Sequence, residues 1–173
     1  TVYLGDQNGA HLIAVDARTG DKRWVTPLDE HPLAILTQSP IVHDGVVYEG
    51  VSSNEEAYSA LIPGYPCCSF RGSMTAVSAR TGAVLWRTWM TPAGYSGAAV
   101  WGSTTALDPS ARTLSVDTGN NYTVPAAAKA CQQGGGTAAG CLSPDNHIDA
   151  VLALDMDTGA IRWSTGVVGF DDW

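Results

Sequence analysis

Short apolar runs, separated by polar turns that contain glycine, fill most of this chain. Such runs lie on both sides of three Thr-Gly turns, at Gly20, Gly82 and Gly159. Apolar strands on either side of a tight turn predict a β-hairpin, because glycine supplies the positive φ that the turn requires. Helical periodicity is weak along the sequence. The pattern therefore predicts an all-β chain.

Each of the three turns belongs to a longer phrase that is repeated. Ala precedes the turn glycine by six residues and Trp follows it by four, as in Ala14, Gly20 and Trp24. The other two copies run from Ala76 to Trp86 and from Ala153 to Trp163. A repeat with fixed spacing is one supersecondary unit that buries its apolar face by stacking on its neighbours. We expect each Trp to be a packing anchor between sheets.

The distances between repeats predict long loops. The repeats are 62 and 77 residues apart, from Gly20 to Gly82 and from Gly82 to Gly159, whereas a propeller blade takes roughly 40–50 residues. The surplus falls into loops at residues 51–70 and 120–147, and long loops of this kind usually carry function.

Two more hairpins are expected between the repeats. One covers residues 40–48 around an Asp-Gly turn, and the other covers residues 105–117. Three repeats are too few to close a ring of four to eight blades. The chain also starts inside an apolar run. We interpret residues 1–173 as one incomplete domain, a fragment of a longer chain.

Charge and length exclude some classes of partner. The formal net charge is −8 and the pI is about 4.7, which argues against nucleic acid, since phosphates require a basic surface. No apolar run reaches membrane-spanning length. The four cysteines all lie in Gly- and Pro-containing loops and lack zinc-site spacing. An even number of loop cysteines predicts disulfides and an oxidising compartment.

The cysteines allow two pairings. Cys67 and Cys68 are adjacent in the sequence, so a bond between them closes a small ring. The alternative is that these two pair separately with Cys131 and Cys141. The residues alone leave both possibilities open.

Several segments of the chain resemble one known family. The repeated phrase resembles the tryptophan-docking repeat of the quinoprotein alcohol dehydrogenases. Six other segments, in order along the chain, resemble polyvinyl-alcohol dehydrogenase and its relatives. They are Ser52-Ser-Asn-Glu-Glu56, Pro66-Cys-Cys-Ser-Phe-Arg-Gly-Ser73, Ala99-Val-Trp-Gly-Ser103, Thr118-Gly-Asn-Asn-Tyr122, Ser143-Pro-Asp-Asn-His147 and Phe170-Asp-Asp-Trp173.

This resemblance implies a fold and an activity. The fold implied is an eight-bladed β-propeller, of which this chain supplies about three blades. The activity implied is oxidation of secondary alcohols, with polyvinyl alcohol as one substrate, by hydride transfer to pyrroloquinoline quinone (PQQ) in the presence of calcium. An alcohol or polymeric alcohol substrate, a cytochrome-type electron acceptor and a periplasmic or secreted location follow from the same resemblance. The isolated fragment is expected to be inactive.

The resemblance also implies residues that hold the quinone. A disulfide between Cys67 and Cys68 covers one face of the quinone, and Trp101 covers the other. Stacking on an indole suits a planar tricyclic ring. Arg71 resembles an arginine that touches the quinone oxygens. The alternative is that Trp101 is a fourth packing tryptophan.

A second set implied by the resemblance holds calcium. The ligands are Glu55, Asn120 and Asp171, with Glu56 as an alternative to Glu55. Carboxylate and amide oxygens are the hard ligands that calcium prefers. Asp171 is also placed to take the proton of the alcohol. The plainer interpretation is that the acids are solvated and that Asn120 is a turn residue.

A non-enzymatic function is the rival hypothesis. The same repeat builds scaffold propellers, such as outer-membrane assembly lipoproteins, that bind proteins and no quinone. Fold alone does not decide between the two. A scaffold has no use for the cysteine pair, Trp101, Asn120 and an acid at position 55 or 56 together, and this combination favours the enzyme.

Overall fold

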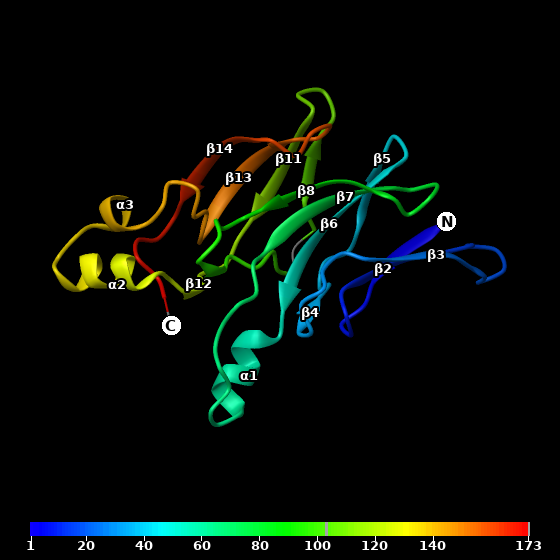
Figure 1. The fold of residues 1–173 in the computed structure, drawn as a ribbon. Coiled ribbons are helices and arrows are strands. Elements are labelled where there is room, and N and C mark those ends of the chain that lie inside the picture. Colours follow the sequence, from blue (N-terminus) through cyan, green and yellow to red (C-terminus); the bar gives the residue numbers. More distant parts are fainter. Residues whose placement is uncertain (103, 173) are drawn as a thin grey trace.

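The computed structural model describes residues 1–102 and 104–172, and it places most strands in three antiparallel sheets that fan out side by side (Figure 1). Ser103 and Trp173, which belong to two of the segments quoted above, lie outside the described residues. The first sheet contains β1 (Val2–Gly5), β2 (His11–Val15) and β3 (Lys22–Pro27). The second contains β5 (Ile41–His43), β6 (Val46–Ser53), β7 (Ser73–Ser78) and β8 (Val84–Trp89), with β4 (Ala34–Ile35) on the end of β6. The third contains β10 (Ala106–Asp108), β11 (Thr113–Asp117), β13 (Ala150–Asp155) and β14 (Ile161–Gly166).

The three repeated phrases form the hairpins β2–β3, β7–β8 and β13–β14, so this prediction is confirmed. The turn glycines Gly20, Gly82 and Gly159 have φ values of 79°, 76° and 72°, a region that glycine enters without a steric cost. The hairpins expected at 40–48 and 105–117 are also present, as β5–β6 and β10–β11.

Two of the three repeat tryptophans join one sheet to the next, whereas Trp163 of the third sheet is 51% exposed, so the expectation of an anchor in every repeat is wrong for Trp163. The indole Nε1 of Trp24 donates to the carbonyl of Ala79 at 3.2 Å, and that of Trp86 donates to the carbonyl of Met156 at 3.1 Å. A Cβ on Gly82 would lie 2.8 Å from the Trp24 ring, and one on Gly159 would lie 2.5 Å from Trp86. These glycines are therefore required both for their turn and for the close approach of the indole.

Two apolar cores lie between the sheets. The core between the first and second sheets includes Leu12 of the first sheet, Leu28 directly after β3, and Val47 and Val77 of the second. The core between the second and third sheets includes Met74 from the second and Leu114, Leu152 and Leu154 from the third. Stacked sheets with a core at each interface are the arrangement expected of consecutive propeller blades.

The two long loops contain secondary structure that the sequence pattern did not reveal. The first holds α1 (Glu55–Leu61), and the second holds the strand β12 (Asn121–Thr123) with α2 (Ala126–Gln133) and α3 (Ala138–Cys141). Strand β12 pairs with β9 (Ser96–Gly97). Acidic residues in the first turn favour α1, and consecutive alanines favour α2. These helices are short additions to a β architecture. Within the described part of the chain, no helix is long and apolar enough to cross a membrane.

Candidate cofactor and metal site

Residues 119–123, here called the junction segment, lie where the two long loops meet. The backbone N–H of Gly119 donates to the carbonyl of Ala99 at 3.0 Å, and the backbone N–H of Ala98 donates to the carbonyl of Asn120 at 2.7 Å. On the opposite strand, a Cβ on Gly97 would lie 2.4 Å from the Asn120 carbonyl oxygen. Only glycine lets the two backbones come this close, so Gly97 fixes the position of the junction segment.

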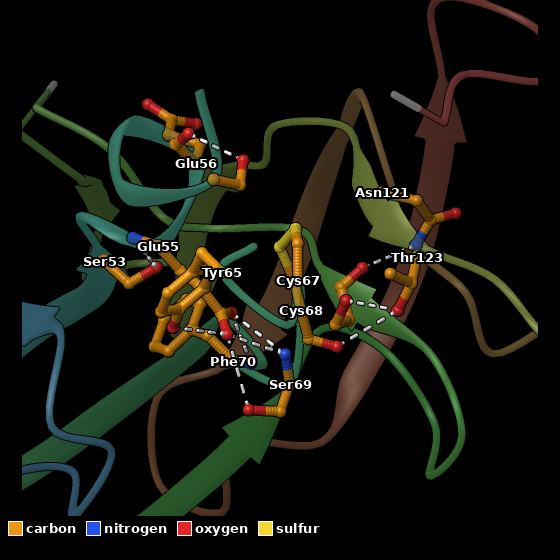
Figure 2. Close-up of a disulfide and its surroundings, with 12 residues drawn as sticks. Ser53, Glu55, Glu56, Tyr65, Cys67, Cys68, Ser69, Phe70, Asn121 and Thr123 are labelled. Carbon is orange, nitrogen blue, oxygen red and sulfur yellow. Dashed lines mark hydrogen bonds between the residues drawn. A yellow bond between two sulfur atoms is a disulfide. The ribbon is translucent and has the colours of Figure 1, made fainter. Parts of the chain in front are cut away.

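The cysteine pair lies beside this segment. The structure contains the disulfides Cys67–Cys68 and Cys131–Cys141 and no free cysteine among the described residues. The carbonyl of Cys68 accepts a hydrogen bond from Thr123 Oγ1 at 3.2 Å, and Figure 2 shows the disulfide between the Glu55 side and the β12 side of the site. Cys67 is exposed and Cys68 is half-buried. One side of the disulfide is therefore open to a ligand.

Glu55 holds the loop that carries this disulfide. Its carboxylate accepts hydrogen bonds from the amide of Ser69 at 2.9 and 3.0 Å, the amide of Phe70 at 2.8 Å and the hydroxyl of Tyr65 at 3.2 Å (Figure 2). The residue is only 1% exposed. The interpretation of Glu55 as a solvated loop acid is therefore wrong, because both of its oxygens bind the chain immediately after the cysteines.

His31 joins this cluster, which the sequence did not reveal. Its Nε2 lies 3.1 Å from Ser69 Oγ and 3.5 Å from Glu55 Oε1. Its Nδ1 accepts a hydrogen bond from the amide of Leu33 at 3.2 Å. An Nδ1 that accepts carries no proton, so the neutral ring is protonated on Nε2 and donates from there. The ring cannot take a proton from Ser69 in this tautomer, and the three residues do not form a nucleophilic triad.

Glu56, the neighbour of Glu55, lies against the junction segment. Burial raises the pKa of its carboxyl, while a hydrogen bond from Tyr122 acts in the opposite direction. Burial also raises the pKa of Tyr122, with the Glu56 charge adding to the effect. Glu56 therefore lies beside the junction segment, whereas the carboxylate of Glu55 binds the disulfide loop, and the choice between them as calcium ligand stays a prediction.

Trp101 packs on the start of the junction segment. A Cβ on Gly119 would lie 3.2 Å from the indole Nε1, so glycine leaves room for the ring. The carbonyl of Trp101 accepts a hydrogen bond from Gln38 Nε2 at 2.8 Å. The side chain is half-buried against the core that also contains Phe70.

Asn120 and Asp171 are connected by hydrogen bonds to the backbone of Asn121. The Asn120 side chain donates from Nδ2 to the carbonyl of Asn121 at 2.9 Å, and the amide of Asn121 donates to the carbonyl of Asp171 at 3.2 Å. Next to Asp171, Asp172 pairs with Lys129 of α2 at 3.1 Å.

Asp149 is a further acid at this place, and the sequence did not reveal it. Burial and the charge of Asp171 both raise the pKa of its carboxyl. Its Oδ2 is buried and has no hydrogen-bond partner among the described residues. Its φ is 43°, an uncommon value for a residue other than glycine, though aspartate is enriched there.

Arg71 is the predicted residue whose side chain lies elsewhere. Its Nε donates to the carbonyl of Thr91 at 3.0 Å, and its guanidinium lies 4.7 Å from the centroid of the Trp89 ring. Burial lowers the pKa of the guanidinium. Its contact with a quinone therefore stays a prediction, and the observed contacts join β8 to the segment after the disulfide.

No cluster of three or more His, Cys, Asp or Glu suited to a metal occurs in the part of the chain that the structure describes. The predicted calcium set contains two acids and one amide, so it does not need such a cluster.

The sequence and fold of this chain are similar to those of known proteins. No protein-family model matches the chain. It is 33% identical over 176 residues to polyvinylalcohol dehydrogenase of Sphingopyxis sp. (strain 113P3), covering 93% of this chain and 24% of that protein. It is 32% identical over 187 residues to polyvinylalcohol dehydrogenase of Pseudomonas sp., covering 99% of this chain and 26% of that protein. The crystal structure of quinohemoprotein alcohol dehydrogenase from Comamonas testosteroni superposes with a TM-score of 0.73 at 27% identity, over 99% of this chain and 26% of that one.

The chain is homologous, over nearly its whole length, to part of the quinoprotein alcohol dehydrogenases. Its fold is a partial β-propeller. The chain spans about a quarter of the length of the curated relatives it matches. BamB from Moraxella catarrhalis is also similar, with a TM-score of 0.52 at 22% identity over 95% of this chain and 33% of that one. That likeness concerns the fold alone.

Proposed function

We propose that this chain forms the PQQ- and calcium-binding part of a dehydrogenase that oxidises secondary alcohols, with polyvinyl alcohol as the candidate substrate. One observation carries the proposal. The junction segment contains Asn120 and is in contact with Cys68 through Thr123, with Glu56 through Tyr122, with Asp171 through Asn121 and with Trp101 at Gly119. Residues far apart in the sequence converge on five consecutive positions, which a bare scaffold does not require.

The donors at this place suit calcium. Among the described residues, Asn120 Oδ1 and the exposed carboxylate of Asp171 accept no hydrogen bond. Asp149 adds a buried oxygen without a partner. Uncommitted oxygens from carboxylates and an amide are what a hard cation binds. We propose Asn120, Asp171 and one acid of the pair Glu55 and Glu56 as the protein ligands.

The surroundings also suit a flat ring system. Trp101 offers an indole next to Gly119, and Cys67–Cys68 offers a compact surface that is open on one side. PQQ supplies the oxidant when it is bound, and calcium makes the quinone a better electron acceptor. The task of the protein is then to orient the alcohol and to take its hydroxyl proton, for which the Asp171 carboxylate is the candidate base.

A cytochrome-type electron acceptor and a periplasmic or secreted location belong to the same proposal. The two disulfides support an oxidising compartment. The remaining blades of the propeller would be supplied by a longer chain.

Cofactor omission tests the proposed function. We expect dye-linked oxidation of a secondary alcohol by the complete protein to require both PQQ and calcium, because the proposed site holds them together. The assay compares the apoprotein with PQQ alone, calcium alone and both. Failure of every alcohol, with no quenching of tryptophan fluorescence by PQQ, would instead support a protein-binding scaffold.

Paired substitutions at Glu55 and Glu56 test which acid binds calcium. Since both oxygens of Glu55 already accept amide hydrogens, we expect Glu55→Gln to lower the free energy of unfolding by about 2 kcal/mol, the range for hydrogen bonds to a charged group. We expect Glu56→Gln to leave stability within about 0.5 kcal/mol and to weaken calcium binding at least tenfold. Calorimetric titration of each variant with calcium measures the effect, and a loss of affinity in Glu55→Gln alone would assign the metal to Glu55.

A further inference from the structure

A reciprocal amide pair lies behind the junction segment. Nδ2 of Asn121 donates to Oδ1 of Asn146 at 3.1 Å, and Nδ2 of Asn146 donates to Oδ1 of Asn121 at 2.8 Å. The second hydrogen on Nδ2 of Asn121 goes to the carbonyl of Ser96 at 3.1 Å. Asn121 is 0% exposed. Every donor of its side chain is therefore used, and the two amides fix one another's orientation.

The backbone of Asn121 connects the two groups that the proposed function needs. Its carbonyl accepts from Nδ2 of Asn120 at 2.9 Å, and its amide donates to the carbonyl of Asp171 at 3.2 Å. The first bond engages the Asn120 amide nitrogen and leaves Oδ1 for a cation. The second bond sets the distance of the Asp171 segment from the junction segment. A shift of Asn121 would thus displace the ligand and the base together.

Asn146 is itself held from two sides. The backbone N–H of Asn146 donates to the carbonyl of Ser143 at 3.0 Å. The backbone N–H of the next residue, His147, donates to the carbonyl of Met90 at 2.9 Å. Met90 is fully buried in the core between the second and third sheets. The Asn146 side chain therefore presents its amide to Asn121 from a fixed point of the propeller body.

We infer that Asn146 is a positioning residue for the calcium ligand Asn120 and the base Asp171, and that it acts through the buried amide of Asn121. This inference rests on the proposed function. Residues that orient metal ligands without touching the metal typically change affinity by 10- to 100-fold when they are replaced. A residue that only packed the loop would change stability and leave the calcium affinity of the folded protein as it was.

The test measures calcium binding by titration calorimetry on the complete protein without PQQ, so it does not depend on activity. We expect Asn146→Ala to weaken calcium binding at least tenfold in a protein that still unfolds cooperatively. Asn8→Ala is the matched control, because Asn8 lies in an exposed turn of the first sheet and its side chain makes no hydrogen bond among the described residues. We expect that variant to bind calcium like the wild type.

A double-mutant cycle separates positioning from packing. If Asn146 positions both Asn120 and Asp171, Asn146→Ala causes a smaller loss of affinity in an Asn120→Ala background than in the wild type, because only the effect through Asp171 remains. Equal losses in both backgrounds, or an unchanged affinity in the single variant, would overturn the inference while leaving the proposed function in place. Absence of calcium binding by the wild type would overturn both.

Asn146→Ser keeps the inference testable if the Asn146→Ala variant does not fold. Asn146→Ser keeps a hydroxyl that donates and accepts, so we expect its calcium affinity to lie between those of the wild type and of Asn146→Ala. A serine variant that folds and binds calcium as tightly as the wild type would also contradict the inference.

Discussion

Replacing Asp171 by asparagine is expected to slow alcohol oxidation by the complete protein by about three orders of magnitude, within the range for loss of a general base. Asparagine keeps the size of the side chain and an oxygen for calcium but cannot accept the hydroxyl proton at neutral pH. The effect should therefore fall on kcat. Steady-state kinetics with a secondary alcohol, with PQQ and calcium saturating, measures it.

Asp172 provides the control for this experiment. It is adjacent in sequence, but its carboxylate is paired with Lys129, which is largely exposed. An ion pair of this kind contributes at most about 1 kcal/mol, so Asp172→Asn should change kcat by no more than a few-fold. A large loss in Asp172→Asn with near-normal activity in Asp171→Asn would exchange the roles of the two acids.

The largest expected effect on stability concerns Glu49, a fully buried acid in β6. Neither carboxyl oxygen has a hydrogen-bond partner among the described residues. A Cβ on Gly5 of the first sheet would lie 3.3 Å from its Oε1, so the side chain lies at the interface of the first two sheets. Burial raises its pKa from 4.5 to about 8.

This pKa fixes the direction of the pH dependence. Between pH 4.5 and about 8 the folded protein keeps a proton on Glu49 that the unfolded chain has lost. The free energy of unfolding therefore falls as the pH rises through this window and levels off above it. The stability that the raised pKa contributes is fully present below pH 4.5.

Glu49→Gln should remove this dependence. Glutamine stays neutral at every pH, so we expect the variant to be more stable than the wild type at pH 7, by an amount on the order of 3 kcal/mol. Urea unfolding across the pH range measures it. Glu30→Gln, at an exposed acid, should leave the pH dependence unchanged. A Glu49→Gln variant with the wild-type slope would show that another group is responsible.

Local features of the sequence predicted the fold well. The fixed spacing of Gly20 and Trp24, and of its two copies, is enough to place the hairpins, because a turn that needs positive φ and an anchor that needs space are both local requirements. Asp44-Gly45 gave the β5–β6 turn for the same reason, with φ values of 45° and 78°. The helices were missed because each is a short segment inside a Gly- and Pro-rich loop.

The resemblance predicted which residues form the site, but not the hydrogen bonds that hold them in place. The resemblance named Asn120, Trp101 and Asp171, and the structure places all three at the junction segment. The hydrogen bonds of Glu55 to the disulfide loop, and the pairing of Asn121 with Asn146 across 25 positions, depend on how distant loops meet. No local pattern encodes such contacts. The contacts of Arg71 with Thr91 and Trp89 are of the same kind, and the sequence did not reveal them.

Trp24 and Trp86 each dock on the turn of the following sheet, and this makes the stability of the protein depend on the order of the sheets. Trp24 reports on the turn at Gly82, and Trp86 reports on the turn at Gly159, so a disturbance in one blade is sensed by the chromophore of the blade before it. The stability of each blade thus includes an interface energy with its nearest neighbours, as in a linear array of repeats. Loosening of the third blade would first change the fluorescence of Trp86, in the second, and would reach Trp24 only if the second blade opened as well.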